Sequence, residues 1–212
     1  MVATKANLKA MGFAGLDGAF GANDANITFS SSFAFDFDNS NGVTAGQLDF
    51  ETVAAHEIGH ALGFISGVDD VDFLVGLGAA APVDVFPLDL FRFEEGTAND
   101  PATAANFATF PRSMTSNTAA NTDDIAHEWR MSTGSDSGDG RQASHWRDDL
   151  LGGSLVGVMD PTLSAGVVEL VALPDLRALD VIGYEIVPEP ASFLLLAMGM
   201  IGIAAVGRLR TR

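Results

Sequence analysis

The sequence contains no cysteine in its 212 residues. Without thiols the chain has no disulfide framework, no cysteine nucleophile and no internal cysteine switch. Basic residues are also few, because 11 Lys and Arg stand against 28 Asp and Glu. Three of the arginines and one glutamate follow residue 187, so residues 1–187 carry 8 basic and 27 acidic side chains. This acidity argues against binding to nucleic acid phosphates or to anionic lipid surfaces.

A composition of 47% hydrophobic and 18% charged residues is nevertheless that of a globular protein, and the length fits one domain with a tail. Hydrophobic spacing and turn residues predict the main elements. We expect a short helix over 4–11, a strand over 27–37, a helix over 47–64 and a helix over 174–183. Residues 94–143 are rich in Thr, Asn, Ala, Ser, Asp and Gly, and are expected to be mostly loop.

The expected helix over 47–64 contains the sequence His56-Glu-Ile-Gly-His60. Histidines four residues apart lie on one face of a helix, where both imidazoles can bind one metal ion. Glu57 then lies beside the metal, where it can accept a proton from the metal-bound water and later donate it to a leaving amine. The pattern therefore predicts a zinc site with His56 and His60 as ligands and Glu57 as the catalytic base.

A catalytic zinc ion needs a third protein ligand and one open position. The position three residues past the glycine that ends the motif helix is Ser66, and serine is a poor zinc ligand. The sequence has only two other histidines, His145 and His127. His145 is the preferred third ligand, and His127 or an acidic residue such as Asp69 or Asp89 remains an alternative.

The preference for His145 comes from a resemblance. His145-Trp146, followed by Met159-Asp-Pro161, resembles the leishmanolysin-like metzincins, in which a long insertion separates the motif helix from the third histidine. The resemblance implies that His145 is a zinc ligand, that Met159 forms the Met-turn beneath the metal, and that residues 65–144 are the insertion. It extends to bacterial metalloproteases with a PEP-CTERM tail through the segments HEIGHALGF, GDGRQASHW, MDP, DLFRF and DVIGY.

The C-terminal segment differs from the rest of the chain. Val187-Pro-Glu-Pro-Ala-Ser192 leads into an apolar run over 191–207 and then into three arginines. Such a run is long enough to cross a bilayer, and the arginines would remain in the cytoplasm. The segment resembles the PEP-CTERM sorting tail of Gram-negative bacteria, which implies export and cleavage by an exosortase. Because residues 1–10 show no signal peptide, which such a tail normally accompanies, we expect the chain to be N-terminally truncated.

A calcium ion is a weaker expectation. Asp36, Asp38, Ser40 and Asn41 form part of a calcium-loop pattern, but the bidentate glutamate that ends such a loop is not in its place. The segment is therefore more readily explained as a plain turn.

Together these patterns predict an α+β, metzincin-like zinc endopeptidase with an active-site helix, a small sheet, a long loop-rich insertion and a C-terminal helix. The catalytic domain would span residues 1–187, with an N-terminal subdomain that is incomplete, and the sorting tail with its hydrophobic helix would span 188–212. A protein or peptide substrate would lie along residues 27–37. Two alternatives remain: an exported structural protein of the cell envelope with a degenerate or structural zinc site, and a zinc hydrolase that acts on a non-peptide amide or ester.

Overall fold

A computed structural model describes residues 1–94, 103–109, 111–114 and 129–187. Its helices are α1 (Lys5–Ala10), α2 (Leu16–Phe20), α3 (Phe50–Leu62), α4 (Val68–Gly76), α5 (Ala104–Thr109) and α6 (Leu173–Val181), with 3₁₀ turns at Asn39–Asn41, Pro87–Phe91 and Asp149–Leu151. Its strands are β1 (Phe35–Asp36), β2 (Leu48–Asp49), β3 (Phe93–Glu94), β4 (Arg112–Ser113) and β5 (Arg130–Met131). Strands β1 and β2 pair in parallel, and β3, β4 and β5 form an antiparallel sheet in that order.

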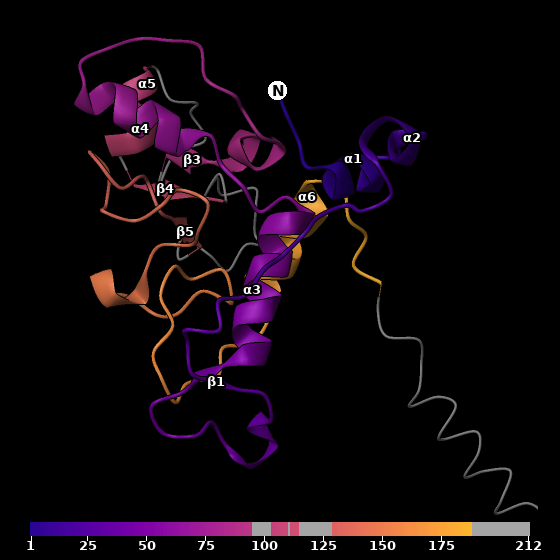
Figure 1. The fold of residues 1–212 in the computed structure, drawn as a ribbon. Helices are drawn as coiled ribbons and strands as arrows, with labels where there is room; N and C mark the ends of the chain where they lie inside the picture. Colours follow the sequence, from indigo (N-terminus) through magenta and orange to yellow (C-terminus); the bar gives the residue numbers. More distant parts are fainter. Residues whose placement is uncertain (95–102, 110, 115–128, 188–212) are drawn as a thin grey trace, which may run out of the picture.

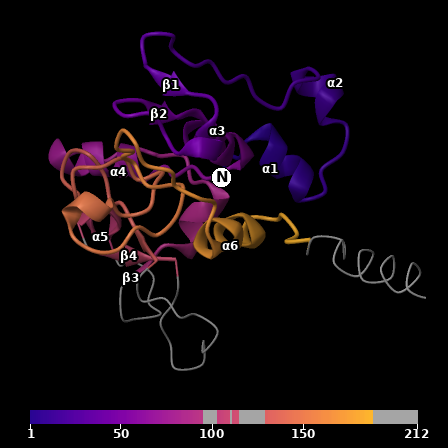
Figure 2. The same cartoon turned by 90° about the horizontal axis from the view of Figure 1, so that it is seen from below.

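The long helix α3 lies in the middle of the molecule. Helices α1 and α2 lie on one side of it, and α4, α5 and the β3–β5 sheet lie on the other (Figures 1 and 2). Helix α6 lies beside α3, so the C-terminal part of the described chain returns to the central helix. Every other described element is therefore arranged around the helix that carries the histidine motif.

Local sequence explains where α3 begins and ends. The Asp49 carboxylate accepts hydrogen bonds from the backbone N–H of Thr52 at 2.9 Å and from its hydroxyl at 2.7 Å, which caps the first turn. Gly63 ends the helix with φ of +119°, a left-handed conformation that favours glycine. Between these two residues the predicted helix is confirmed, although Ile58 is 48% exposed and does not join the core.

The predicted helices over 4–11 and 174–183 correspond to α1 and α6. The strand predicted over 27–37 is wrong for most of its length, since only Phe35–Asp36 pairs with another strand. Its phenylalanines instead pack on each other and on Phe50 at the start of α3. The segment expected to be mostly loop contributes α5, β4 and β5, and the helix α4 was not predicted. The hydrophobic pattern did not predict α4, because Asp72 occupies a buried position at which a helix pattern needs an apolar residue.

The main core forms where α3, α6 and the segment around residues 145–159 meet. Its buried members are Phe64, Leu88, Met114, Met131, Trp146, Val158, Met159, Ala178 and Ile182. Within the described ranges, no helix has both the length and the apolar character needed to cross a bilayer. The apolar run over 191–207 lies outside those ranges.

Candidate metal centre

The structure brings three of the four histidines together. The Nε2 atom of His56 lies 3.1 Å from Nε2 of His60 and 3.2 Å from Nε2 of His145. His56 and His60 come from consecutive turns of α3, whereas His145 comes from a segment 89 positions beyond His56. The convergence predicted from the sequence is therefore present in the fold.

The opposite nitrogen of each ring fixes its orientation. Each Nδ1 lies at hydrogen-bond distance from a backbone carbonyl oxygen: His56 from Val158 at 2.8 Å, His60 from Phe64 at 2.8 Å and His145 from Gln142 at 3.1 Å. A carbonyl oxygen accepts only, so each Nδ1 carries the proton and donates it. All three Nε2 atoms then present lone pairs to one another. Three acceptors within such short distances repel unless a cation or a shared proton lies among them.

Burial favours the neutral form of two of these rings, His60 and His145. It lowers the pKa of His60, and the charges of His56 and Glu57 act on it more weakly and in opposite directions. Burial also lowers the pKa of His145 to about 3, assisted by the nearby rings of His60 and His56. Neutral imidazoles are the form that binds metal ions, so burial holds these two rings in the form that a metal needs.

Aromatic packing explains how a distant segment reaches α3. Phe64, just beyond the end of the helix, packs edge-to-face against Trp146 with ring centroids 5.0 Å apart. Both side chains are fully buried. Each is a neighbour of the metal centre, since the Phe64 carbonyl accepts from His60 and Trp146 directly follows His145. Burial of this pair therefore draws His145 toward the helix.

Met159 packs against α3 at Gly59, between the two histidines of the helix. The Met159 side chain is buried, and a Cβ atom added at Gly59 would overlap its sulfur. The glycine between the two helical histidines is therefore required for close approach of the methionine. The preceding residue, Val158, supplies the carbonyl that orients His56, so this turn acts on the metal centre through both packing and a hydrogen bond.

Asp175 links the segments that carry His145 and Met159 to the start of α6, and sequence reasoning missed this role. Its buried carboxylate accepts from the Trp146 indole N–H at 2.7 Å and from the backbone N–H groups of Val158 and Met159 at 2.9 and 3.3 Å. It also accepts from the N–H of Ala172 at 2.7 Å, at the start of α6. The sequence signal was an acid in the first turn of a helix, which indicates a cap and does not reveal the other partners.

Glu57 lies in the wall of a groove beside the metal centre. The groove has a volume of about 660 Å³ and is also lined by His60, by other residues of α3 and by the segment 24–35. Glu57 follows His56 on the helix and is partly exposed. A carboxylate at this position borders both the histidines and an open space large enough for a peptide.

The structure places the alternative third ligands elsewhere or leaves them undescribed. The Asp69 carboxylate accepts from the N–H of Ala143 at 3.0 Å, and Asp89 accepts from the N–H groups of Gly67 and Phe86. Neither belongs to the histidine cluster. His127 lies outside the described residues.

The calcium expectation at Asp36 and Asp38 receives a simpler explanation. Asp36 accepts from the N–H groups of Asp38 and Thr44, and Asp38 accepts from the N–H and hydroxyl of Ser40. These hydrogen bonds are those of a turn. They stabilise the ionised carboxylates and lower the pKa of both groups.

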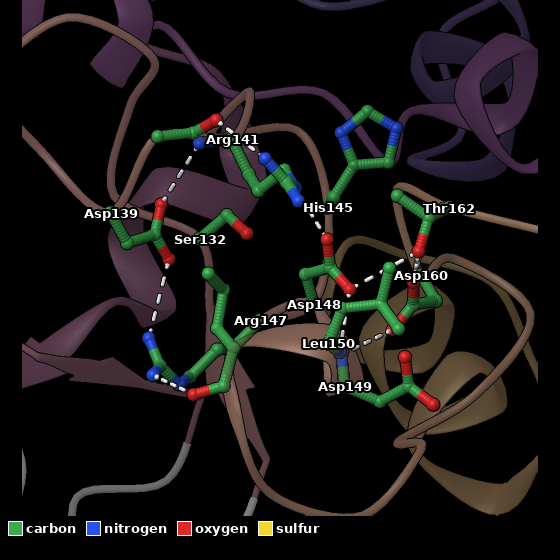
Figure 3. A network of polar contacts seen from close by, with 12 residues as sticks. Ser132, Asp139, Arg141, His145, Arg147, Asp148, Asp149, Leu150, Asp160 and Thr162 are labelled. Carbon is green, nitrogen blue, oxygen red and sulfur yellow. Dashed lines mark hydrogen bonds and ion pairs between the residues drawn. The ribbon is translucent and has the colours of Figure 1, made fainter.

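A second acidic cluster follows His145 in the chain (Figure 3). Asp148, Asp149 and Asp160 lie close enough to share an ion. However, the Asp148 carboxylate already accepts from Arg141, Thr162 and the N–H of Leu150. Figure 3 shows the His145 ring directed away from this network. The cluster therefore stabilises the loop between His145 and Met159, the two residues at the ends of that loop.

Comparison with known proteins bears on the C-terminal tail. A family model described as the PEP-CTERM protein-sorting motif matches residues 187–210. The motif indicates an exported protein that is sorted to the cell envelope through this tail, and it implies recognition by an exosortase-type processing enzyme. No curated protein and no solved structure matches the chain. The histidine cluster therefore has to be interpreted from its own geometry.

Proposed function

We propose that residues 1–187 form a metzincin-like zinc endopeptidase and that the cluster of His56, His60 and His145 holds its metal. The main support for this proposal is the convergence of three Nε2 lone pairs. Each ring is oriented by an Nδ1–H group that donates to a carbonyl oxygen. A zinc ion at about 2.0–2.1 Å from each nitrogen in a tetrahedral arrangement separates the nitrogens by about 3.3 Å. The distances of 3.1 and 3.2 Å fit that requirement.

The bound zinc would supply Lewis acidity toward a peptide carbonyl and toward a water molecule. Glu57 would accept the proton that this water loses and donate it to the leaving amine. Three protein ligands leave one position open for the water and the substrate, which is the arrangement of a catalytic site rather than a structural one. Met159 would support the metal centre by packing against Gly59, between the two helical histidines.

We further propose that the chain reaches the envelope of a Gram-negative bacterium, where the apolar run over 191–207 anchors it in the membrane until an exosortase cleaves near Pro188. The motif at 187–210 supports this route. The catalytic residues all precede the tail, so cleavage there would release an intact metal centre.

The test compares the parent chain with Glu57→Gln. This change keeps the shape of the side chain and removes its basicity, so casein hydrolysis should fall by about 100-fold to 10,000-fold. Zinc content, measured by elemental analysis, should remain near one ion per chain in both proteins. The matched control is Glu51→Gln, which alters an exposed glutamate at the other end of α3 and should leave activity unchanged.

Other outcomes support the alternative functions. A parent that takes up no zinc, or that hydrolyses casein no faster than Glu57→Gln, contradicts the proposal and favours an exported structural protein. A parent whose zinc-dependent activity is confined to small esters or non-peptide amides favours the other hydrolase. His145→Ala should lose most of the bound zinc, whereas retained zinc in that variant would contradict the ligand set.

A further inference from the structure

The groove beside the metal centre has an aromatic wall. Its larger apolar lining residues are Ile27, Phe29, Phe33, Phe35, Val53 and Ile65. The segment that supplies the first four of these runs along α3 from α2 to β1 in both views of the fold (Figures 1 and 2). Because Glu57 and His60 line the same groove, whatever occupies it lies directly beside the metal centre.

The rings of this wall pack on one another and still expose apolar surface. Phe35 lies 6.4 Å from Phe29 at 86° and 6.1 Å from Phe33 at 46°, measured between ring centroids and planes. Phe33 remains 59% exposed and Ile27 39% exposed. An additional ring placed against them would bury this surface and gain edge-to-face contacts.

The same segment offers backbone groups to a ligand. Among the described residues, the N–H and C=O groups of Ala25 to Phe29 have no backbone hydrogen-bond partner. Unpaired backbone groups in an accessible segment can pair with an extended peptide, while a neighbouring pocket takes one of the peptide's side chains. The groove therefore offers both halves of a peptide subsite.

Charge limits which peptide fits. The charged side chains that line the groove are Asp24 and Glu57, and both are acidic. Lys5 and Lys9 lie near Asp24 and form ion pairs with it and with Asp17. These ion pairs offset the charge of Asp24, so an acidic side chain in the groove would meet the charge of Glu57 next to an apolar wall.

We infer that this groove binds an aromatic side chain of the peptide substrate next to the scissile bond, with Phe33 as the main specificity residue. The inference rests on the proposed peptidase function and adds the class of substrate. Peptides with Phe, Tyr or Trp at that position are cleaved in preference to those with Ala, and those with Asp are cleaved least.

The experiment uses the full chain loaded with zinc. Digestion of a peptide mixture first locates the position at which residue type matters most, and matched peptides with Phe, Ala or Asp there are then compared. Phe33→Ala should lower the ratio of kcat/KM for Phe over Ala by about fivefold, the loss expected for one ring contact. Phe33→Tyr should keep the ratio. Phe20→Ala is the control, because Phe20 is 69% exposed on α2 and does not line the groove.

A ratio unchanged by Phe33→Ala, or a parent that prefers Asp or Ala, overturns the inference while leaving the peptidase intact. Peptide binding to Glu57→Gln, followed by fluorescence anisotropy, separates the two proposals. Binding that favours the Phe peptide and weakens in the Phe33→Ala, Glu57→Gln double variant supports the groove even if the parent cleaves nothing. Equal binding of all three peptides overturns the groove assignment whatever the activity.

Discussion

At the scale of single residues, the surroundings of a side chain decide its chemistry here more than its type does. Carboxylates illustrate this. Hydrogen bonds from the Thr44 side chain and from the backbone of Asp38 and Thr44 lower the pKa of Asp36, whereas Glu169 is partly buried among other acids. Burial, followed by the charges of Asp160 and Asp149, raises the pKa of Glu169 to about 7. Two carboxylates of one chain thus differ in whether ionisation favours the fold.

Glu169 therefore makes stability depend on pH. Its folded-state pKa of about 7 exceeds the ordinary value of 4.5, so between these values the folded chain holds more protons than the unfolded chain. The stabilising contribution is present below pH 4.5 and is lost as the pH rises through 7. Glu169→Gln should raise the free energy of unfolding at pH 8 by about 2 kcal/mol and change it little at pH 4.

Urea unfolding of Glu169→Gln and the parent across this pH range measures the difference. Glu185→Gln, an exposed glutamate near the end of the described chain, is the control and should show no such trend. A larger stabilisation at pH 4 than at pH 8 would reverse the assigned direction.

At the scale of elements, the candidate metal centre depends on contacts between α3 and the turn that carries Met159. Sequence alone predicted the parts of this arrangement that are local. His56 and His60 share a helix face because of their spacing, and the helix itself followed from its apolar pattern. The role of Asp175 was not accessible, because its partners lie up to 29 positions away and become neighbours only in the folded chain. The strand expected over 27–37 failed because aromatic packing replaced strand pairing there.

Gly59→Ala tests the contact between helix and turn. The added methyl group would collide with the Met159 sulfur, so the variant should lose about 1–3 kcal/mol of stability and part of its zinc affinity. Met159→Ala should cost about 2–5 kcal/mol through the cavity that it leaves. In the double variant the alanine at 59 no longer meets the sulfur. The double variant should therefore be destabilised by about 1–2 kcal/mol less than the sum of the two single variants.

Thermal unfolding and zinc titration of the four proteins provide this comparison. Gly18→Ala, on α2 with open space around its Cα, is the matched glycine control and should not destabilise the chain. Strict additivity of the Gly59 and Met159 changes would show that the two residues do not meet.

At the scale of the whole molecule, the chain combines a folded body with a sorting tail of opposite charge character. The three histidines, Met159 and Asp175 all lie within residues 1–187. A chain that stops after residue 187 should therefore bind zinc and hydrolyse casein as the full chain does, within experimental error. Loss of zinc from the shortened chain would show that the tail contributes to the metal centre.

The distance in sequence between the histidines has a consequence for timing. The two on α3 appear early, but the third emerges only after another 85 positions (145 − 60), and its supporting carboxylate follows 30 positions later still (175 − 145). A chain threaded across a membrane from its N-terminus would hold an incomplete set of donors until nearly all of the body had passed. If residues 1–187 have the proposed activity, the exported part of the chain would gain it only after the third histidine and its supporting carboxylate had crossed.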